Sequence, residues 1–217
     1  MTGSDTRAKL LTAAQDALRD DGIAALSARS IAARAGVNQA LVFYHFNSVG
    51  ELVETACRRA CDDSVLFYRE QFAAVGSLAE LLEVGRELHE RERGLGNVAM
   101  MAQLMAGAQR DDVLASAARY AMSTWNAEIE SVVRRVLVGS AFADIADPAG
   151  LARAISAGFI GLELYDGIDR LGAQQALDAL QRLGVLVEVM DDLGPVASRA
   201  LRARVRRTSR AGRATHA

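Results

Sequence analysis

The chain has 217 residues, of which 51% are hydrophobic and 24% charged, and its 25 basic side chains nearly balance 27 acidic ones. This composition can supply a buried core and excludes disordered, collagen-like and highly charged proteins. Because there are only two prolines and the apolar residues occur in long stretches, the sequence favours an all-α fold over a β-sandwich or barrel.

The chain has two cysteines, Cys57 and Cys61, which are too few for a disulfide framework. They lie one helical turn apart, and we interpret them as small buried hydrophobic residues rather than metal ligands or redox sensors, because no second pair of ligands is evident. The polar N-terminal segment lacks the apolar core of a signal peptide, and no apolar run reaches the roughly 18 residues of a membrane span. We therefore expect a cytoplasmic protein without a membrane segment.

Charge is distributed unevenly along the chain. Residues 1–46 have a net charge of +1, residues 47–193 a net charge of −10, and the segment after Gly194 has seven arginines and no acidic residue. The overall charge of −2 therefore does not exclude a nucleic-acid partner.

The N-terminal segment is predicted to form three helices. Ser27 and Asn38 are suited to N-capping the second and third helices, and Gly36 permits a left-handed turn between them. The predicted helices span residues 6–21, 28–35 and 39–46.

Six further helices are predicted by the spacing of apolar residues and by their end signals, such as Pro148 in a first helical turn. They span residues 48–74, 77–92, 97–108, 111–138, 149–168 and 173–192. We expect the Arg-rich tail, residues 194–217, to be solvated and partly disordered rather than a second contact with DNA.

Three short helices with a glycine-containing turn between the second and third form a helix-turn-helix pattern, whose third helix can enter the DNA major groove. Glutamine can pair with adenine, apolar groups can meet the thymine methyl, and Tyr and His can donate to phosphate oxygens. The third helix offers side chains of each kind, namely Gln39, Ala40, Leu41, Phe43, Tyr44 and His45.

The segment SARSIAARAGVNQALVFYHFNSVGEL, residues 27–52, closely resembles the DNA-binding signature of TetR-type bacterial transcriptional regulators, whose usual form is T-x-x-x-IA-x-x-AGVS-x-GTLYYHF-x-SKEEL. The resemblance extends over about residues 6–56. It implies that Ser27 contacts a phosphate, that Arg29 occupies a position where some members of the family use a base-reading side chain, and that Tyr44 and His45 contact the backbone. The DNA-binding residues that it implies are Ser27, Arg29, Asn38, Gln39, Ala40, Leu41, Phe43, Tyr44 and His45.

The segment also departs from the TetR signature. Ala40 replaces a common glycine, Leu41 replaces a common threonine, and Val49 with Gly50 replaces the Lys-Glu pair of SKEEL. Loss of that lysine removes a phosphate contact, so we predict a modest salt dependence of DNA binding, since each neutralised phosphate contributes about −0.9 to the log–log slope.

The resemblance implies a DNA-binding domain of residues 1–46 and a ligand-binding and dimerisation domain of residues 47–193. In the family the last two strong helices, here 149–168 and 173–192, form a four-helix dimer interface, and Gly158 and Gly161 would permit close approach there. A homodimer also follows from function, because two recognition helices about 34 Å apart match a palindromic operator.

The resemblance also implies a pocket for an unknown small-molecule effector, which we expect to be apolar. Candidate lining residues are Met101, Leu104, Met105, Met122, Trp125 and Phe159, for which ordinary core packing is the alternative. His89, in the charged run HERER, is expected at the solvated end of a helix. With three scattered histidines, no phosphate loop and no nucleophile motif, we expect no enzyme, no cofactor and no metal site.

The sequence therefore predicts a homodimeric repressor that a small molecule releases from a palindromic operator, although activation stays open. The helix beginning near residue 48 would act as a lever that changes the separation of the two recognition helices. The alternatives are a ligand-independent or architectural DNA-binding dimer, and a helical enzyme or carrier with a helix-turn-helix head.

Overall fold

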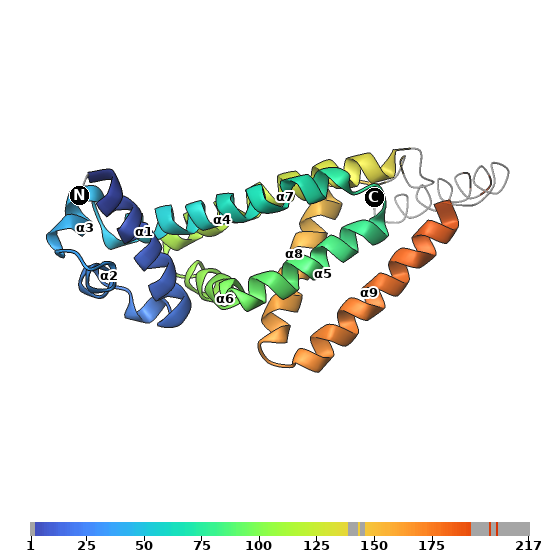
Figure 1. The fold of residues 1–217 in the computed structure, drawn as a ribbon. Helices are drawn as coiled ribbons and strands as arrows, with labels where there is room; N and C mark the ends of the chain where they lie inside the picture. Colours follow the sequence, from blue (N-terminus) through green and yellow to red (C-terminus); the bar gives the residue numbers. More distant parts are fainter. Residues whose placement is uncertain (1–2, 139–142, 144–145, 192–199, 201–202, 204–217) are drawn as a thin grey trace, which may run out of the picture. The chain divides into compact units, whose positions relative to one another are not determined.

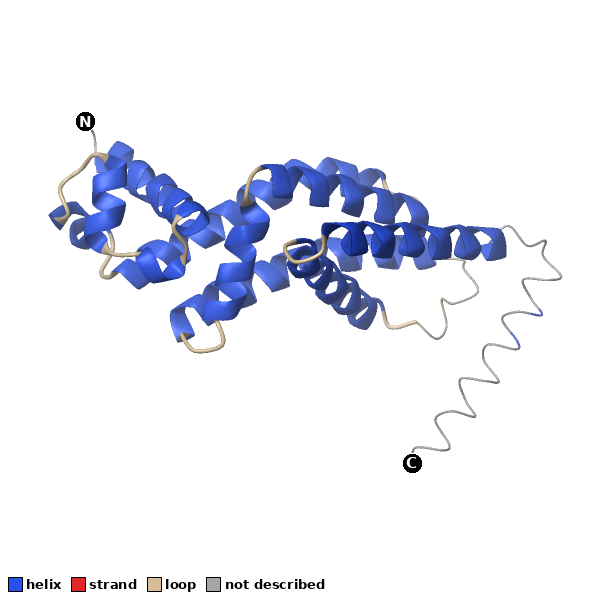
Figure 2. Cartoon of the chain, turned by 90° about the horizontal axis from the view of Figure 1, so that it is seen from below, coloured by secondary structure: helices blue, strands red, loops and turns tan. Residues whose placement is uncertain are grey.

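The computed structural model describes residues 3–138, 143, 146–191, 200 and 203. This part of the chain consists of α-helices and one 3-10 helix joined by turns (Figures 1 and 2), which confirms the all-α prediction. None of the described helices has the length and apolar character needed to cross a bilayer. The elements are α1 (Gly3–Asp20), η1 (Ile23–Ala25), α2 (Ala28–Ala35), α3 (Ala40–His45), α4 (Val49–Ala74), α5 (Leu78–Gly94), α6 (Asn97–Gly107), α7 (Asp112–Leu137), α8 (Pro148–Asp166) and α9 (Arg170–Asp191).

Each predicted helix corresponds to one α-helix of the described residues, and the differences lie at the ends. The last helix begins three residues earlier than predicted, at Arg170, because the Asp169 carboxylate accepts a hydrogen bond from the Gly172 N–H at 3.0 Å and caps the helix. Helix α3 ends at His45 because Phe46 adopts an extended conformation. The predicted Arg-rich tail lies outside the described residues apart from positions 200 and 203.

Tertiary contacts divide the chain into two compact units. The first comprises Met1–Tyr68 and His89–Trp125, and the second comprises Arg69–Leu88 and Asn126–Ala217. Helices α4, α5 and α7 each contribute residues to both units. The predicted boundary at residue 46 separates a DNA-binding domain from a ligand-binding and dimerisation domain. This functional division stays a prediction.

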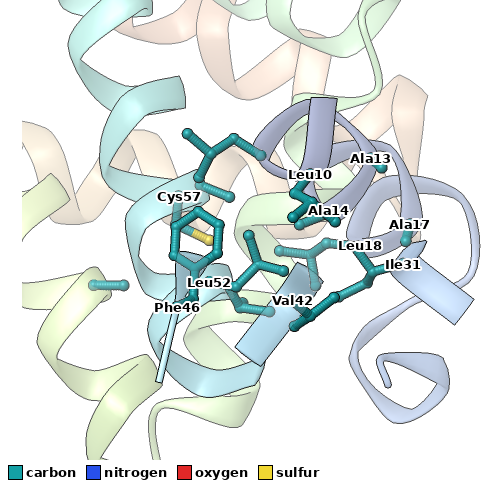
Figure 3. Close-up of a cluster of buried hydrophobic side chains, with 14 of the residues drawn as sticks. Leu10, Ala13, Ala14, Ala17, Leu18, Ile31, Val42, Phe46, Leu52 and Cys57 are labelled. Carbon is teal, nitrogen blue, oxygen red and sulfur yellow. The ribbon is translucent and has the colours of Figure 1, made fainter. Parts of the chain in front are cut away.

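The first unit has a core to which all its N-terminal helices contribute (Figure 3). Leu10 of α1, Ile31 of α2, Val42 of α3 and Leu52 of α4 are each fully buried in it. Leu104 of α6 packs in the same cluster. Because α4 supplies part of this core, a displacement of its first turns would also move α3.

A charged clamp reinforces the contact between α1 and α2. The Arg34 guanidinium at the end of α2 donates to the carboxylates of Asp20, at 2.6 Å, and Asp21, at 2.8 Å. These hydrogen bonds to the two carboxylates raise the pKa of Arg34. Asp20 and Asp21, at the end of α1, are therefore both hydrogen-bonded to Arg34 of α2.

The second unit contains the hairpin of α8 and α9, which join around residues 167–169 (Figure 1). Asp147 caps α8 by accepting from the Ala149 N–H at 3.1 Å, and Pro148 occupies the first turn. Helix α9 approaches α5 closely: a Cβ added at Gly184 would lie 2.9 Å from a methyl carbon of Leu82.

Candidate nucleic-acid interface

The start of α2 is fixed by a reciprocal capping box. The Ser30 N–H donates to Ser27 Oγ and the Ser27 N–H donates to Ser30 Oγ, both at 3.0 Å. Ser27 is exposed, as is Arg29 in the first turn of the helix. The structure therefore presents to solvent both of the α2 side chains that were predicted to contact DNA.

The turn between α2 and α3 depends on glycine. Gly36 has φ 66° and ψ 35°, a left-handed conformation that other residues adopt at a cost. The N–H groups of Gly36 and Val37 donate to the carbonyls of Ala33 and Ala32, at 3.2 and 3.0 Å, and so satisfy the end of α2. The predicted turn is confirmed, and it sets the direction in which α3 leaves α2.

Helix α3 is short and has one buried face and one exposed face. Asn38 caps it, because its Oδ1 accepts a hydrogen bond from the Ala40 N–H at 2.8 Å. Val42 and Phe46, four residues apart, are 0% and 2% exposed and point into the core (Figure 3). The opposite face carries the exposed side chains Gln39, Ala40, Phe43 and Tyr44, whereas Leu41 and His45 are half-buried at its edges.

Two large aromatic side chains project from the exposed face of α3. Tyr44 is 79% exposed and Phe43 is 53% exposed. The Tyr44 ring meets the His45 ring edge to face, with their centroids 4.9 Å apart. Adjacent aromatic side chains that the core does not use are typical of a binding surface.

The exit from α3 leads directly into a capped α4. Ser48 Oγ accepts from the Glu51 N–H at 3.0 Å, and the Glu51 carboxylate accepts from Asn47 Nδ2 at 2.7 Å. Val49 and Gly50 add no cation to this end of the helix. The hydrogen-bonding groups of Asn47 and Ser48 thus serve mainly to connect α3 rigidly to α4.

Most cationic side chains of residues 1–46 are paired with local carboxylates. Lys9 pairs with Asp5 at 3.8 Å, Arg19 with Asp16 at 3.0 Å, and Arg34 with both Asp20 and Asp21. Arg29 has no ion pair within the described residues, and neither has Arg7. The positive charge available to a phosphate backbone is therefore concentrated at Arg7 and Arg29.

The position of Arg7 was missed by sequence reasoning, which counted it only as a charge. Its guanidinium lies 4.9 Å from the centroid of the Phe46 ring, next to the junction between α3 and α4. The two residues are far apart in the chain, so no local pattern could have paired them. Arg7 joins the candidate DNA-binding residues on this basis.

The predicted effector-binding residues occupy several places. Leu104 is buried in the core of the first unit with Met105 packed against it, and Trp125 packs against a small buried cluster that includes Cys61. The remaining predicted residues, Met101, Met122 and Phe159, are half-buried. Their role in effector binding stays a prediction.

The prediction for His89 was wrong, because this residue is buried rather than at a solvated helix end. Glu92, one turn later, is also buried and belongs to a chain of hydrogen bonds that joins α1 to α4, α5 and α6. Arg19 Nη2 donates to Asn97 Oδ1 at 3.0 Å, and Asn97 Nδ2 donates to Glu92 Oε2 at 2.5 Å. Ser64 Oγ of α4 donates to the other Glu92 oxygen at 3.2 Å.

Both cysteines are buried, as predicted, and both thiols are free. Burial raises the pKa of Cys57 and of Cys61 to about 12. At neutral pH they are therefore protonated, weakly nucleophilic groups in a hydrophobic environment.

An exposed helix-turn-helix unit, here joined to further helices in the described residues, is typical of DNA-binding transcription factors. Residues 10–56 match the sequence profile described as "Bacterial regulatory proteins, tetR family". That match covers the second half of α1, the rest of the candidate interface and the start of α4, and it supports a TetR-family transcriptional regulator.

Solved structures support the same fold. A protein of Streptomyces coelicolor A3(2), described as a transcriptional regulator, is 25% identical, with a TM-score of 0.65 over 82% of this chain and 98% of its own. A TetR-family protein of a Rhodococcus species is 22% identical, with a TM-score of 0.70 over 87% and 100%. A regulator of Saccharomonospora viridis, solved in complex with choline, is 21% identical, with a TM-score of 0.68 over 81% and 95%. No curated protein matches the sequence significantly.

Proposed function

We propose that the chain acts as a homodimeric repressor that binds a palindromic operator and is released from it by a small-molecule effector. The observation that carries the proposal is the exposed face of α3, where the aromatic side chains Tyr44 and Phe43 are 79% and 53% exposed. A helix of only six residues reads few base pairs, so a second copy related by two-fold symmetry is needed for a specific site.

The dimer interface that we propose is formed by α8 and α9, the two helices to which the TetR resemblance assigns it. Large apolar side chains are exposed around the turn of this hairpin: Ile168 is 86% exposed and Leu171 is 69% exposed. Outside the backbone of α8 itself, a Cβ added at Gly158 or Gly161 would meet no atom of the described residues within 4 Å. Apolar surface and backbone that a second hairpin could approach closely both support pairing of two copies here.

The proposed effector is a small molecule bound by the residues after position 46. One structural relative was solved with choline, which supports a pocket for a small organic molecule in this fold. The candidate pocket residues remain Met101, Leu104, Met105, Met122, Trp125 and Phe159.

Helix α4 is the proposed link between effector and DNA. Leu52, Val53 and Ala56 of its first two turns are buried in the same core as Val42 of α3. An effector that binds more tightly to one tilt of α4 therefore also favours one position of α3, and it weakens operator binding by its differential affinity for the two states.

The first experiment is a mobility-shift assay of the full-length protein on DNA flanking its own gene, with competitor DNA and at two salt concentrations. A competitor-resistant shift supports the regulator, and light scattering of the complex gives the number of subunits. If no sequence-specific DNA is found by genome-wide selection either, the proposal fails. A specific palindromic footprint that no metabolite abolishes would instead support the ligand-independent dimer.

The residue assignments have a separate test. Arg29→Ala and Tyr44→Ala should each weaken operator binding while the circular dichroism spectrum and subunit number stay unchanged, because both side chains are exposed. Unchanged affinity in both variants would refute the assignment of these residues to the DNA interface.

A further inference from the structure

The side chains of α3 limit which base pairs the helix can recognise in the major groove. Residues 35–50, which include all of α3, contain no Arg, Lys, Asp or Glu. Arginine and lysine are the side chains that pair with guanine O6 and N7, and aspartate or glutamate accept from cytosine N4. Helix α3 therefore lacks the charged groups that specify a G·C pair in the major groove.

Several polar groups in the same segment are already engaged. Asn38 Oδ1 caps α3 at 2.8 Å from the Ala40 N–H, and Asn47 Nδ2 donates to Glu51 at 2.7 Å. Gln39 precedes the first turn with an exposed side chain that makes no hydrogen bond to another described residue. Glutamine can form the bidentate pair with adenine N6 and N7.

Apart from Tyr44, which the TetR resemblance assigns to the DNA backbone, the other exposed side chains of α3 are apolar. Phe43 lies one helical turn after Gln39. Its ring is 53% exposed, although an apolar side chain of this size is usually buried. Ala40 presents a methyl group on the same face. The complementary apolar group in the major groove is the C5-methyl of thymine.

We propose that α3 reads A·T pairs by packing Phe43 and Ala40 against thymine methyl groups while Gln39 pairs with adenine, so that the thymine methyl is the main specificity element of the half-site. This inference rests on the proposed function, because it requires that α3 enter the major groove. It assigns Phe43 as the residue that discriminates thymine from the other bases.

The test removes single methyl groups from the DNA. Duplexes selected from a random library by the full-length protein are resynthesised with deoxyuridine in place of one thymine at a time, which deletes the methyl and keeps the base pair. Fluorescence anisotropy then measures affinity. At one or more half-site positions the substitution should weaken binding about 4-fold, the effect of one buried methyl-sized group.

Protein variants identify the side chain that is responsible. Phe43→Ala should weaken binding to the thymine duplex and make the thymine and deoxyuridine duplexes equal at its position. Phe67→Ala is the matched control, because Phe67 of α4 is 52% exposed, nearly the same as Phe43, and lies outside the interface. This control should keep the full preference for thymine.

The two proposals fail in different ways. A selected half-site dominated by G·C pairs, or equal binding of thymine and deoxyuridine at every position, overturns the inference while leaving a sequence-specific regulator. Retention of the thymine preference in Phe43→Ala likewise overturns the assignment of Phe43. If the library yields no sequence-specific duplex, the proposed function itself fails and takes the inference with it.

Discussion

The arrangement of charges in residues 1–46 predicts how operator binding depends on salt. Only Arg7 and Arg29 lack a carboxylate partner among the described residues of this segment, so a dimer offers four such cations. At about −0.9 per neutralised phosphate the log–log slope is about −3.6, which corresponds to an affinity loss of about 150-fold between about 50 and 200 mM salt. Arg29→Ala removes two of the four cations and should reduce the slope to about −1.8, or a loss of about 12-fold.

Anisotropy titrations of the full-length protein at four or five salt concentrations measure these slopes. Arg29→Lys is the control, because it keeps the charge and should keep the slope. If Arg29→Lys changes the preference for one base pair, Arg29 reads that base rather than the backbone. A wild-type slope steeper than about −6 would refute the reasoning, since paired cations or the C-terminal arginines would then have to contact phosphates.

Three further predictions concern stability and reactivity. Gly96→Ala should destabilise the protein by about 1 kcal/mol more than Gly36→Ala in urea denaturation. Both glycines have positive φ, but a Cβ at position 96 would lie 2.6 Å from Arg19 Cδ, whereas one at position 36 meets nothing within 4 Å; equal losses would contradict this explanation. The Cys57 thiol, with a pKa of about 12, should not react with Ellman's reagent at pH 8 until the protein is denatured, and rapid reaction of the native protein would disprove its burial. Glu54 accepts a hydrogen bond from a serine hydroxyl of α7 at 2.8 Å, which lowers its pKa below 4.5. Its contribution to stability is complete above pH 4.5 and is lost as the pH falls through the lowered pKa, so Glu54→Gln should flatten the acid side of the stability curve, and an unchanged acid side would contradict this role.

The sequence by itself predicted the helices and the turn of the candidate interface. These features depend on residues close together in the chain: the apolar spacing of Val42 and Phe46, the capping side chain of Asn38, and a glycine at position 36. The same short-range pattern supported the family resemblance, because the TetR signature lies within one continuous segment.

The tertiary structure alone decided which charges are free and which polar groups are buried. Arg34 pairs with the end of α1 and Arg7 stacks on Phe46, and both contacts join residues that are distant in sequence. His89 is buried although its neighbours in the chain are charged. A count of charges cannot show which cations of residues 1–46 are paired with carboxylates. The charged residues around His89 likewise have the composition of a solvent-exposed helix. Burial and ion pairing depend on which helices pack together, and that packing is set by the whole core rather than by any local pattern.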